Sequence, residues 1–491
     1  MKSILLPPYA PTLIESTRAI GYTLESAIAD IVDNSVSAKA SSTEIFFFPI
    51  GDSFIAILDN GYGMNAGELQ AAMRYGSQNP NDKRATTDLG RFGLGLKTAS
   101  LSQCRTLTVA SKKGGSVEVC RWDIDHVIAT GEWSLIVLET EEEIDAIPRI
   151  NNLRELESGT LVVWQNLDRL KVGELNFERS MGKKMDDVRA HLSLVFHRYL
   201  SGETGLKKFQ IEINGTPIGC SDPFLTTRNT QVMADEELFI ESAKVIIRPY
   251  ILPHISKLSV SEIEELGGKE GLRKRQGFYV YRNKRLLVWG TWFRMMRQGE
   301  LSKLARIQVD IPNDLDDLWT LDIKKSTAIP PEIVRKNMEK VIERMAARSK
   351  QTWVFRGKKE TNDSVVHIWQ RFKGQQGGFY YGVNRDHPLV DMLFDTSPQI
   401  RRNVEILLKA IENGIPLNQL YLDLTSEKPL ENEAEVTTND VEIMLNLLLD
   451  QMPSVVARKE LLDRLSVSDP FVNYPNIIER YQTGGLNNAC N

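Results

Sequence analysis

The stretch that most constrains this chain runs from residue 24 to residue 38 and reads LESAIADIVDNSVSA. Its apolar residues recur at helical spacing, which predicts an α-helix with one side against a core. Asp30 and Asn34 lie four residues apart on the other side, where such side chains are neighbours. A carboxylate and a carboxamide that project together can hold a hard cation such as Mg²⁺ through oxygen ligands. The alternative interpretation is an ordinary solvated polar face.

Length and charge narrow the class of protein. A chain of 491 residues is too long for one core and predicts about three domains. The 60 basic and 65 acidic residues give a net charge of −5, so any contact with nucleic acid must come from a local basic patch. The four scattered cysteines favour a reducing, cytoplasmic location over a zinc site or a disulfide scaffold. No uncharged apolar run reaches membrane length, so we expect no membrane partner.

A second motif, DNGYG, follows two runs of β-branched and aromatic residues between positions 43 and 58, which predict a hairpin. Asp59, at the end of the second strand, can accept a hydrogen bond from an exocyclic amine such as that of adenine. Gly61 and Gly63 let a ligand ring approach the backbone, and Met64 offers it an apolar contact. An ordinary tight turn is the alternative.

A third motif, GRFGLGLK, follows a polar, turn-rich segment that predicts either a mobile lid or an inert surface loop. Glycines directly before a helix let backbone N–H groups converge on an anion, and the lysine adds a positive charge. Neither the P-loop nor the dinucleotide fingerprint matches this spacing. The candidate phosphate-binding residues are Gly90, Phe92, Gly93, Leu94, Gly95, Leu96 and Lys97.

Further patterns divide the chain into three predicted regions. Residues 1–175 form an α/β nucleotide-binding domain, residues 176–350 a second α/β domain with a linking helix, and residues 351–491 a mainly helical region of unknown role. Three prolines within residues 1–20 predict an extended strap, and Thr23 is placed to cap the helix that follows.

Together, ADIVDNSVSA, LDNGYGMN and GRFGLGLKTAS resemble, in this order, three nucleotide-binding motifs of the GHKL ATPases. This superfamily includes the ATPase part of DNA gyrase, the ninety-kilodalton heat-shock chaperone, histidine kinases, MutL proteins and MORC proteins. Thr160 resembles the fourth motif, a threonine that lines the adenine pocket. The resemblance covers residues 1–350 and is closest to the MORC-like proteins of prokaryotes.

The resemblance implies an α+β two-layer sandwich of the Bergerat type, an S5-like transducer domain, and ATP and Mg²⁺ as cofactors. Asn34 would bind the metal, Asp59 would accept the adenine amine, and Lys325, with Lys324 as the alternative, would reach the γ-phosphate. Asp30 would be the general base, where most members have glutamate. Because its side chain is one methylene shorter, we expect slow hydrolysis.

From this resemblance we expect a nucleotide-gated clamp that forms a homodimer on binding ATP and acts on double-stranded DNA. The setting would be restriction, phage defence or DNA repair, with a helicase or nuclease as partner. A basic and aromatic run between residues 273 and 297 supports DNA binding, and its alternative is a solvated strand edge with core tryptophans. A chaperone-like protein remodeller and a nucleotide-binding scaffold with little turnover are the other hypotheses.

Overall fold

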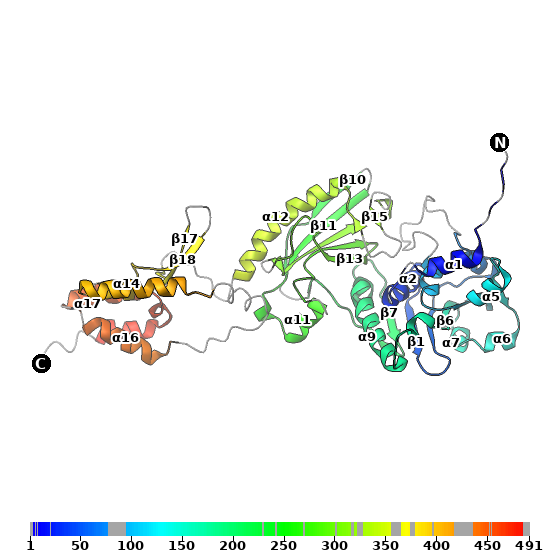
Figure 1. The fold of residues 1–491 in the computed structure, drawn as a ribbon, viewed down its shortest axis with the longest axis horizontal. Helices are drawn as coiled ribbons and strands as arrows, with labels where there is room; N and C mark the ends of the chain where they lie inside the picture. Colours follow the sequence, from blue (N-terminus) through cyan, green and yellow to red (C-terminus); the bar gives the residue numbers. More distant parts are fainter. Residues whose placement is uncertain are drawn as a thin grey trace. The chain divides into compact units, whose positions relative to one another are not determined.

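The structure is a computed structural model, and its chain divides into two compact units, residues 1–354 and residues 355–491. It describes residues 3–4, 6, 8–19, 21–76, 95–227, 230–240, 243–268, 271–299, 302–315, 319–321, 328–354, 365–373, 379–394, 397–416, 436–450, 452 and 454–484. Each unit is described below by itself (Figure 1).

The first unit begins with an eight-stranded sheet in the order β5-β4-β3-β6-β2-β1-β7-β8. Its neighbouring strands are antiparallel except for β1 and β7, which are parallel. The strands are β1 (Ser42–Phe48), β2 (Phe54–Asp59), β3 (Thr106–Lys113), β4 (Ser116–Asp123), β5 (Ile136–Leu138), β6 (Gly159–Gln165), β7 (Gln210–Ile213) and β8 (Thr216–Pro217). The predicted hairpin before DNGYG is therefore confirmed as β1 and β2.

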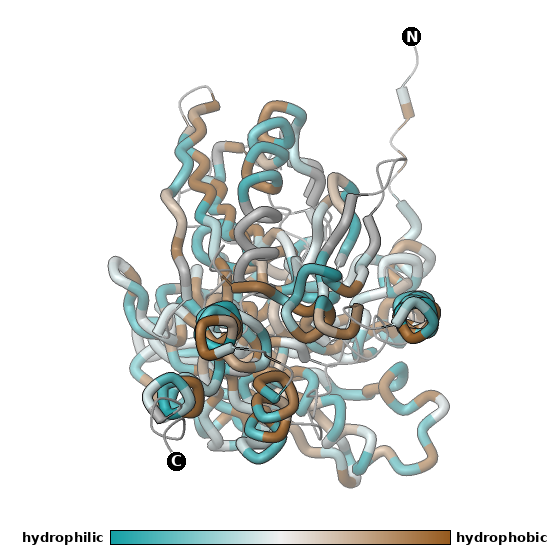
Figure 2. The backbone as a smooth tube through the Cα atoms, turned by 90° about the vertical axis from the view of Figure 1, so that its left-hand side faces the viewer, coloured by the Kyte–Doolittle hydropathy of each residue, from teal (hydrophilic) through white to brown (hydrophobic). Residues whose placement is uncertain are grey.

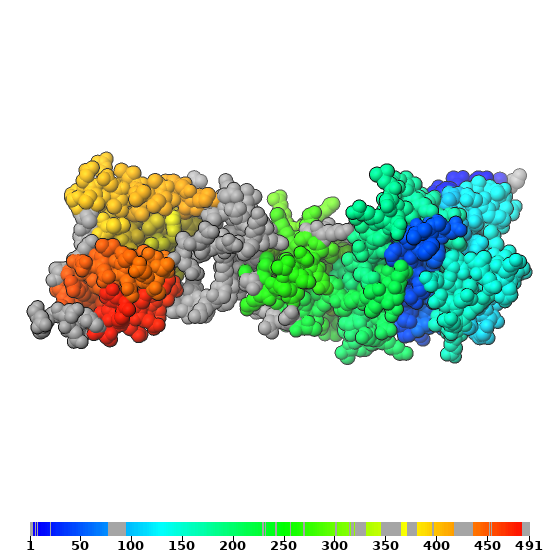
Figure 3. Space-filling model, turned by 90° about the horizontal axis from the view of Figure 1, so that it is seen from below, coloured from blue at the N-terminus to red at the C-terminus, as the bar shows by residue number. Residues whose placement is uncertain are grey.

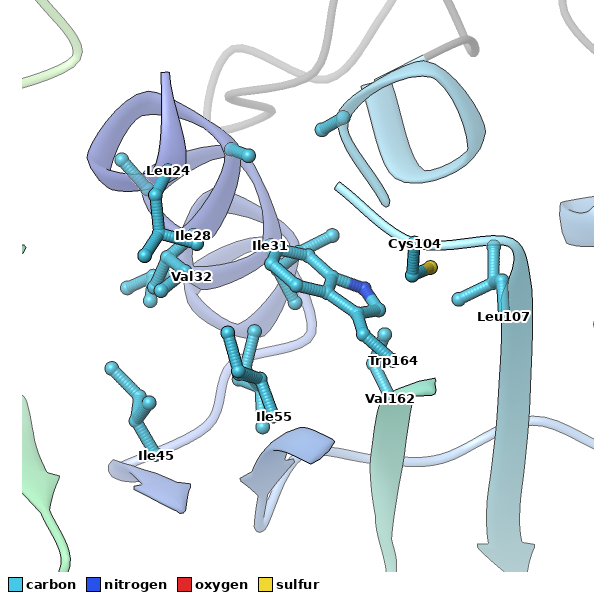
Figure 4. Close-up of a cluster of buried hydrophobic side chains, with 14 of the residues drawn as sticks. Leu24, Ile28, Ile31, Val32, Ile45, Ile55, Cys104, Leu107, Val162 and Trp164 are labelled. Carbon is cyan, nitrogen blue, oxygen red and sulfur yellow. The ribbon is translucent and has the colours of Figure 1, made fainter. Parts of the chain in front are cut away.

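One face of this sheet packs against helices, above all α2 (Leu24–Ser37). Ile28 and Val32 of α2 are fully buried and lie over Ile55 of β2 in the main core (Figure 4). Thr23 caps α2 by accepting a hydrogen bond from the backbone N–H of Ser26, as predicted. The other helices of this part are α1 (Ala10–Arg18), α3 (Ala66–Met73), α4 (Gly95–Leu101), α5 (Ile124–Thr130), α6 (Glu141–Asp145), α7 (Ile150–Glu155), α8 (Asp168–Lys171), α9 (Phe177–Val195) and α10 (His197–Ser201).

The opposite face of the sheet carries a smaller core, to which α6 and α7 contribute Ile144, Ile150 and Leu153. These apolar side chains pack against strand residues such as Ala56 and Val163. Both faces of the central strands are therefore buried, which fits their almost continuous apolar sequences.

The expected extended strap at the N-terminus is wrong for residues 10–18, which form α1. Pro11 lies in the first turn of this helix, where its missing N–H group costs no intrahelical hydrogen bond. Ile14 is fully buried in the main core, and Arg18 donates to the carbonyl oxygen of Leu101. Pro11 therefore marks the start of a packed helix.

A second sheet follows in the order β10-β11-β14-β12-β13, with β9 also paired to β11. The strands are β9 (Gln231–Val232), β10 (Glu236–Ile240), β11 (Ala243–Ile251), β12 (Gly277–Arg282), β13 (Arg285–Thr291) and β14 (Ala305–Ile311), and β15 (Thr320–Leu321) pairs with β16 (Ala328–Ile329). Helices α11 (Val260–Gly267) and α12 (Glu332–Val354) contribute to the core on one face, and the 3₁₀ helices are η1 (Ile255–Lys257) and η4 (Asn313–Leu315).

The hairpin predicted at GFYVYRNKRLLVW is present as β12 and β13, but its turn lies one residue later than expected. Asn283 and Lys284 form the turn, both with positive φ. A two-residue turn of this kind matches the twist of the two strands, and asparagine tolerates positive φ better than most residues. The helix predicted after Pro330-Pro331 is confirmed as α12.

The second unit is mainly helical, as predicted, with one β-hairpin that the sequence did not indicate. Its elements are β17 (Trp369–Lys373), β18 (Phe379–Val383), α13 (Pro388–Phe394), α14 (Pro398–Asn413), α16 (Thr438–Asp450), α17 (Val455–Leu465), α18 (Pro475–Gly484) and the 3₁₀ helix η5 (Phe471–Asn473). Figure 2 shows hydrophobic and hydrophilic residues alternating along the helices of the chain, as expected for amphipathic elements. Leu445 and Leu465 are fully buried in this unit's core.

The expected mixed α/β class is confirmed by the two sheets and their covering helices. None of the helices in the described ranges combines the length and the apolar character that are needed to cross a bilayer.

Candidate functional site

Asp59 is the last residue of β2, and its carboxylate is 7% exposed at the edge of the core. One carboxylate oxygen accepts the backbone N–H of Gly61 at 2.9 Å, and the other accepts the hydroxyl of Ser35 at 3.1 Å. Burial raises the pKa of Asp59 from 3.8 to about 6, although these hydrogen bonds and one from the backbone of Thr160 oppose the rise. The carboxylate is therefore held in a fixed orientation, ready to accept a further donor.

The two glycines that follow Asp59 lie where a larger residue does not fit. A Cβ atom on Gly61 would lie 2.7 Å from Cβ of Ala38 and 2.9 Å from Oδ1 of Asp59. Gly63 has a φ of +65°, and a Cβ atom there would lie 2.0 Å from the carbonyl oxygen of Lys112. Both positions require glycine, and Gly61 keeps the space in front of Asp59 open.

Ser111 of β3 joins the remaining parts of this region, although none of the sequence motifs includes it. Its hydroxyl accepts the backbone N–H of Met64 at 2.8 Å and lies 2.9 Å from the hydroxyl of Thr160. The register of β2 and β6 places Thr160 directly opposite Asp59. The structure therefore brings the candidates Asp59, Gly61, Met64 and Thr160 together at one end of the central strands of the sheet.

The two candidate side chains of α2 lie in different environments. Asn34 is exposed, whereas Asp30 is 4% exposed and its Oδ2 accepts a hydrogen bond from the hydroxyl of Tyr22 at 3.0 Å. A Cβ atom on Gly95 would lie 3.6 Å from the same oxygen, so α4 begins beside Asp30. The interpretation of this helix side as an ordinary solvated face is wrong for Asp30.

Part of the candidate phosphate-binding segment forms the first turn of α4. Gly95 begins the helix, and Leu96 is half-buried against the main core. Lys97 is almost fully buried, and its Nζ donates to the carbonyl oxygen of Ala72 at 2.8 Å. Burial lowers the pKa of Lys97 to about 8.

Several candidates lie outside the described residues. They are Gly90, Phe92, Gly93, Leu94, Lys324 and Lys325, together with most of the expected lid.

The basic and aromatic run that was predicted to bind DNA contains both buried and exposed residues. Arg282, Arg285 and Trp292 are at most 5% exposed, so their side chains belong to the interior of the first unit. Arg273, Lys274, Arg294 and Arg297 remain exposed. The alternative of core tryptophans is therefore correct for Trp292, and the exposed basic surface is smaller than the sequence indicated.

Sequence reasoning missed the groups that hold the candidate side chains in place. Tyr22 orients Asp30, and Ser35 orients Asp59. Ser35 neighbours Asn34 in α2, so a helical projection of the motif could have found it. Asp33 and Arg285 form a buried ion pair across 252 positions of the sequence, and no local pattern indicates such a contact.

Comparison with known proteins gives a family match for the region just described. Residues 22–160 match the family of histidine kinase-, DNA gyrase B-, and HSP90-like ATPases. This range contains α2, Asp59, the glycines Gly61 and Gly63 that follow it, the sequence GRFGLGLK and Thr160.

A curated relative is the ATPase morc-1 of Caenorhabditis elegans, which is 33% identical over 93 residues. This match covers 19% of the present chain and 10% of that protein, so the chain matches a small part of the relative's length. Among solved structures, the crystal structure of the N-terminal domain of a DNA repair protein is similar, with a TM-score of 0.43 and 16% identity. That similarity covers 69% of this chain and 99% of the solved chain.

The matched range holds the acid and amide of α2, the strand-end aspartate and the glycine turn in the order of the three GHKL motifs. Residues 22–160 therefore form a region of the GHKL ATPase type, and part of the chain is similar to a MORC protein.

Proposed function

We propose that this chain binds ATP together with Mg²⁺ at one end of the central strands of the first sheet and hydrolyses it slowly. In this proposal Asp59 accepts the adenine amine, Thr160 and Met64 border the base, and the first turn of α4 faces the phosphates. Asn34 is the protein ligand of the metal. The family match supports ATP binding, and the residue roles are our assignment.

The environment of Asp59 carries the proposal. A buried carboxylate costs free energy unless its oxygens find donors, and here Gly61 and Ser35 supply two. Each carboxylate oxygen has a second lone pair, so the group can still accept one exocyclic amine. Because Gly61 has no Cβ atom, there is room for a flat ring beside the carboxylate of Asp59.

The chemistry of the site fits a magnesium-bound triphosphate. Asn34 presents an exposed carboxamide, and Mg²⁺ usually takes few protein ligands and keeps several waters beside phosphate. When bound, the metal neutralises charge on the phosphate oxygens. Asp30 lies one helical turn away and is oriented by Tyr22, and we assign it as the base that accepts a proton from the attacking water. Its short side chain explains the slow hydrolysis that we expect.

Titration with a non-hydrolysable ATP analogue tests this site. Asp59→Ala and Asn34→Ala should each weaken binding at least about tenfold, since each removes a hydrogen bond or a metal ligand. Asp52→Ala, in the exposed turn between β1 and β2, is the matched control and should bind as the wild type does. Unchanged affinity in both site variants would refute the proposed pocket.

We further propose that ATP binding closes two protomers into a clamp on double-stranded DNA. The exposed residues Arg273, Lys274, Arg294 and Arg297 supply the positive surface for phosphate contacts. Light scattering should show a doubled mass with the analogue, and DNA affinity should fall steeply as salt concentration rises. An unchanged mass would refute the clamp, and salt-independent binding would refute the DNA contact.

Turnover separates the enzyme from a nucleotide-binding scaffold. Steady-state phosphate release should fall to background in Asp30→Ala while analogue affinity stays within about twofold of the wild type, because a general base acts on the chemical step. Equal release by the wild type and the variant would favour the scaffold.

A helicase or nuclease partner and a role in defence or repair remain part of the proposal.

A further inference from the structure

The hairpin of β12 and β13 packs directly against the helices of the nucleotide-binding part. Leu194 of α9 is buried together with Tyr281 of β12 and Leu286 of β13 in one cluster. Tyr199 of α10 donates its hydroxyl to the carbonyl oxygen of Asn283 in the hairpin turn. Figure 3 shows that the blue-green and green segments of the first unit adjoin on one face of the surface. The hairpin and the helices therefore share an interface inside the first unit.

Within this interface Arg285, the first residue of β13, reaches Asp33 of α2. Its Nε donates to Oδ1 of Asp33 at 3.2 Å, and the two side chains are 6% and 1% exposed. Nη1 of Arg285 donates to the carbonyl oxygen of Leu286, and the guanidinium lies 5.8 Å from the ring centroid of Phe196. The contact is a buried ion pair between the second sheet and the helix that carries Asp30 and Asn34.

His191 of α9 lies near the same ion pair but carries no charge. Burial, and to a lesser extent the neighbouring Arg285, lower the pKa of His191 to about 3. The imidazole is therefore neutral at physiological pH, and its ring packs against Trp289 at a centroid distance of 5.7 Å. Asp33 is left as the negative group beside Arg285.

A buried ion pair is weak evidence for stability, because desolvation of both charges offsets their attraction. Breaking it by removing one partner is strongly unfavourable, because the other charge stays buried. Such a pair therefore restricts the interface to arrangements in which the two groups meet. An apolar contact would allow the hairpin to shift along α2 at little cost. A shift that separates the guanidinium from the carboxylate leaves two buried charges without each other and is therefore unfavourable.

The position of Asp33 gives this restriction a consequence for the site. Asp33 directly precedes Asn34 and lies three residues, just under one helical turn, after Asp30. An α-helix moves as a rigid element over this distance, so a displacement at Asp33 moves both neighbours. The position of the β12–β13 hairpin is thereby linked to the position of the candidate base and the candidate metal ligand.

We propose that Asp33 and Arg285 are positioning residues that couple the second sheet to the magnesium-ATP site through α2. This inference rests on the proposed function for its ligand, and on the ion pair itself for its geometry. Neither residue touches the nucleotide in this proposal. The pair holds α2 in the register in which Asp30 and Asn34 face the phosphates.

The test uses the full chain and two measurements, amide hydrogen exchange of α2 without nucleotide and affinity for a non-hydrolysable ATP analogue with Mg²⁺. Asp33→Asn and Arg285→Gln should each speed amide exchange in α2. Each should also lower the affinity for the analogue about 5- to 150-fold, the range typical of coupling between sites. The double variant should be no worse than the worse single variant, because the two residues act as one unit. Arg285→Lys, which keeps the charge, should recover part of the affinity.

The matched control is Asp310→Asn, which removes a partner of the buried Arg198 in the same interface. Arg198 belongs to α10 and Asp310 to β14, so this change should leave α2 exchange and analogue affinity within about twofold of the wild type. Three results would overturn the coupling. They are unchanged α2 exchange in Arg285→Gln, losses of analogue affinity that add up in the double variant, or changes in Asp310→Asn as large as those in the Asp33 and Arg285 variants. If the wild type binds no analogue, the proposed function fails, and hydrogen exchange alone still decides whether the pair fixes α2.

Discussion

The raised pKa of Asp59 predicts that Asp59→Asn stabilises the first unit while it weakens nucleotide binding. The carboxylate is 7% exposed, and burial raises its pKa from 3.8 to about 6. A carboxyl group with a raised pKa favours the fold in its protonated form. Its full contribution to stability is present below pH 3.8 and is lost as the pH rises through about 6.

The magnitude follows from the two pKa values. At pH 8 the ionised carboxylate lowers the free energy of unfolding by about 3 kcal/mol relative to its protonated form, and at pH 5 by about half as much. Asparagine has the same shape, keeps one oxygen for the N–H of Gly61, and carries no charge. We therefore expect the variant to gain stability over the wild type as the pH rises from 5 to 8.

Hydrogen exchange of the β2 and β6 amides at pH 5, 6, 7 and 8 measures this difference within the first unit. The same samples should show weaker analogue binding by the variant, because one of the two acceptor oxygens has become a donor. A stability difference that stays constant between pH 5 and pH 8 would refute the raised pKa. Equal analogue affinity would refute the role of Asp59 in binding adenine.

Three further changes test the groups that surround the site. Tyr22→Phe removes the hydroxyl that orients Asp30, so phosphate release should fall about tenfold with nearly unchanged analogue affinity, and a tenfold loss of affinity instead would contradict this role. Gly63→Ala places a Cβ atom against the carbonyl of Lys112 at a positive φ, and should lower the free energy of unfolding by more than about 2 kcal/mol in urea denaturation. Ser111→Ala removes the hydroxyl that is hydrogen-bonded to Met64, Gly159 and Thr160, and should cost about 1–3 kcal/mol in the same assay, with unchanged stability as the contrary result.

Local patterns in the sequence predicted the elements whose contacts are also local. The helical spacing of the apolar residues in α2 and the cap at Thr23 follow from neighbours within one or two turns. The hairpin before Asp59 follows from a short loop between two β-rich runs. These are the parts of the fold in which backbone preference and hydrophobic pattern agree.

The sequence was misleading where burial decided the outcome. Three prolines near the N-terminus indicated an extended strap, but a proline in the first helical turn is compatible with a helix, and Ile14 had a core to enter. The run that contains Arg282 and Trp292 was interpreted either as a surface for DNA or as a strand edge with core tryptophans, and both of these residues are buried. Charge and aromatic content alone do not tell which side of a strand faces the interior, since a shift of one residue reverses it.

The ion pair of Asp33 and Arg285 shows why a motif does not define the whole site. The three motifs supply the groups that would touch a nucleotide, but the position of α2 also depends on a strand that begins far later in the chain. A buried charge requires a partner of opposite sign, and the fold meets this need by pairing helix α2 with strand β13 of the second sheet. Asp30 and Asn34 can therefore be recognised from their spacing, whereas Arg285, the group proposed to hold their helix in place, is recognised only by asking which charge faces the buried Asp33.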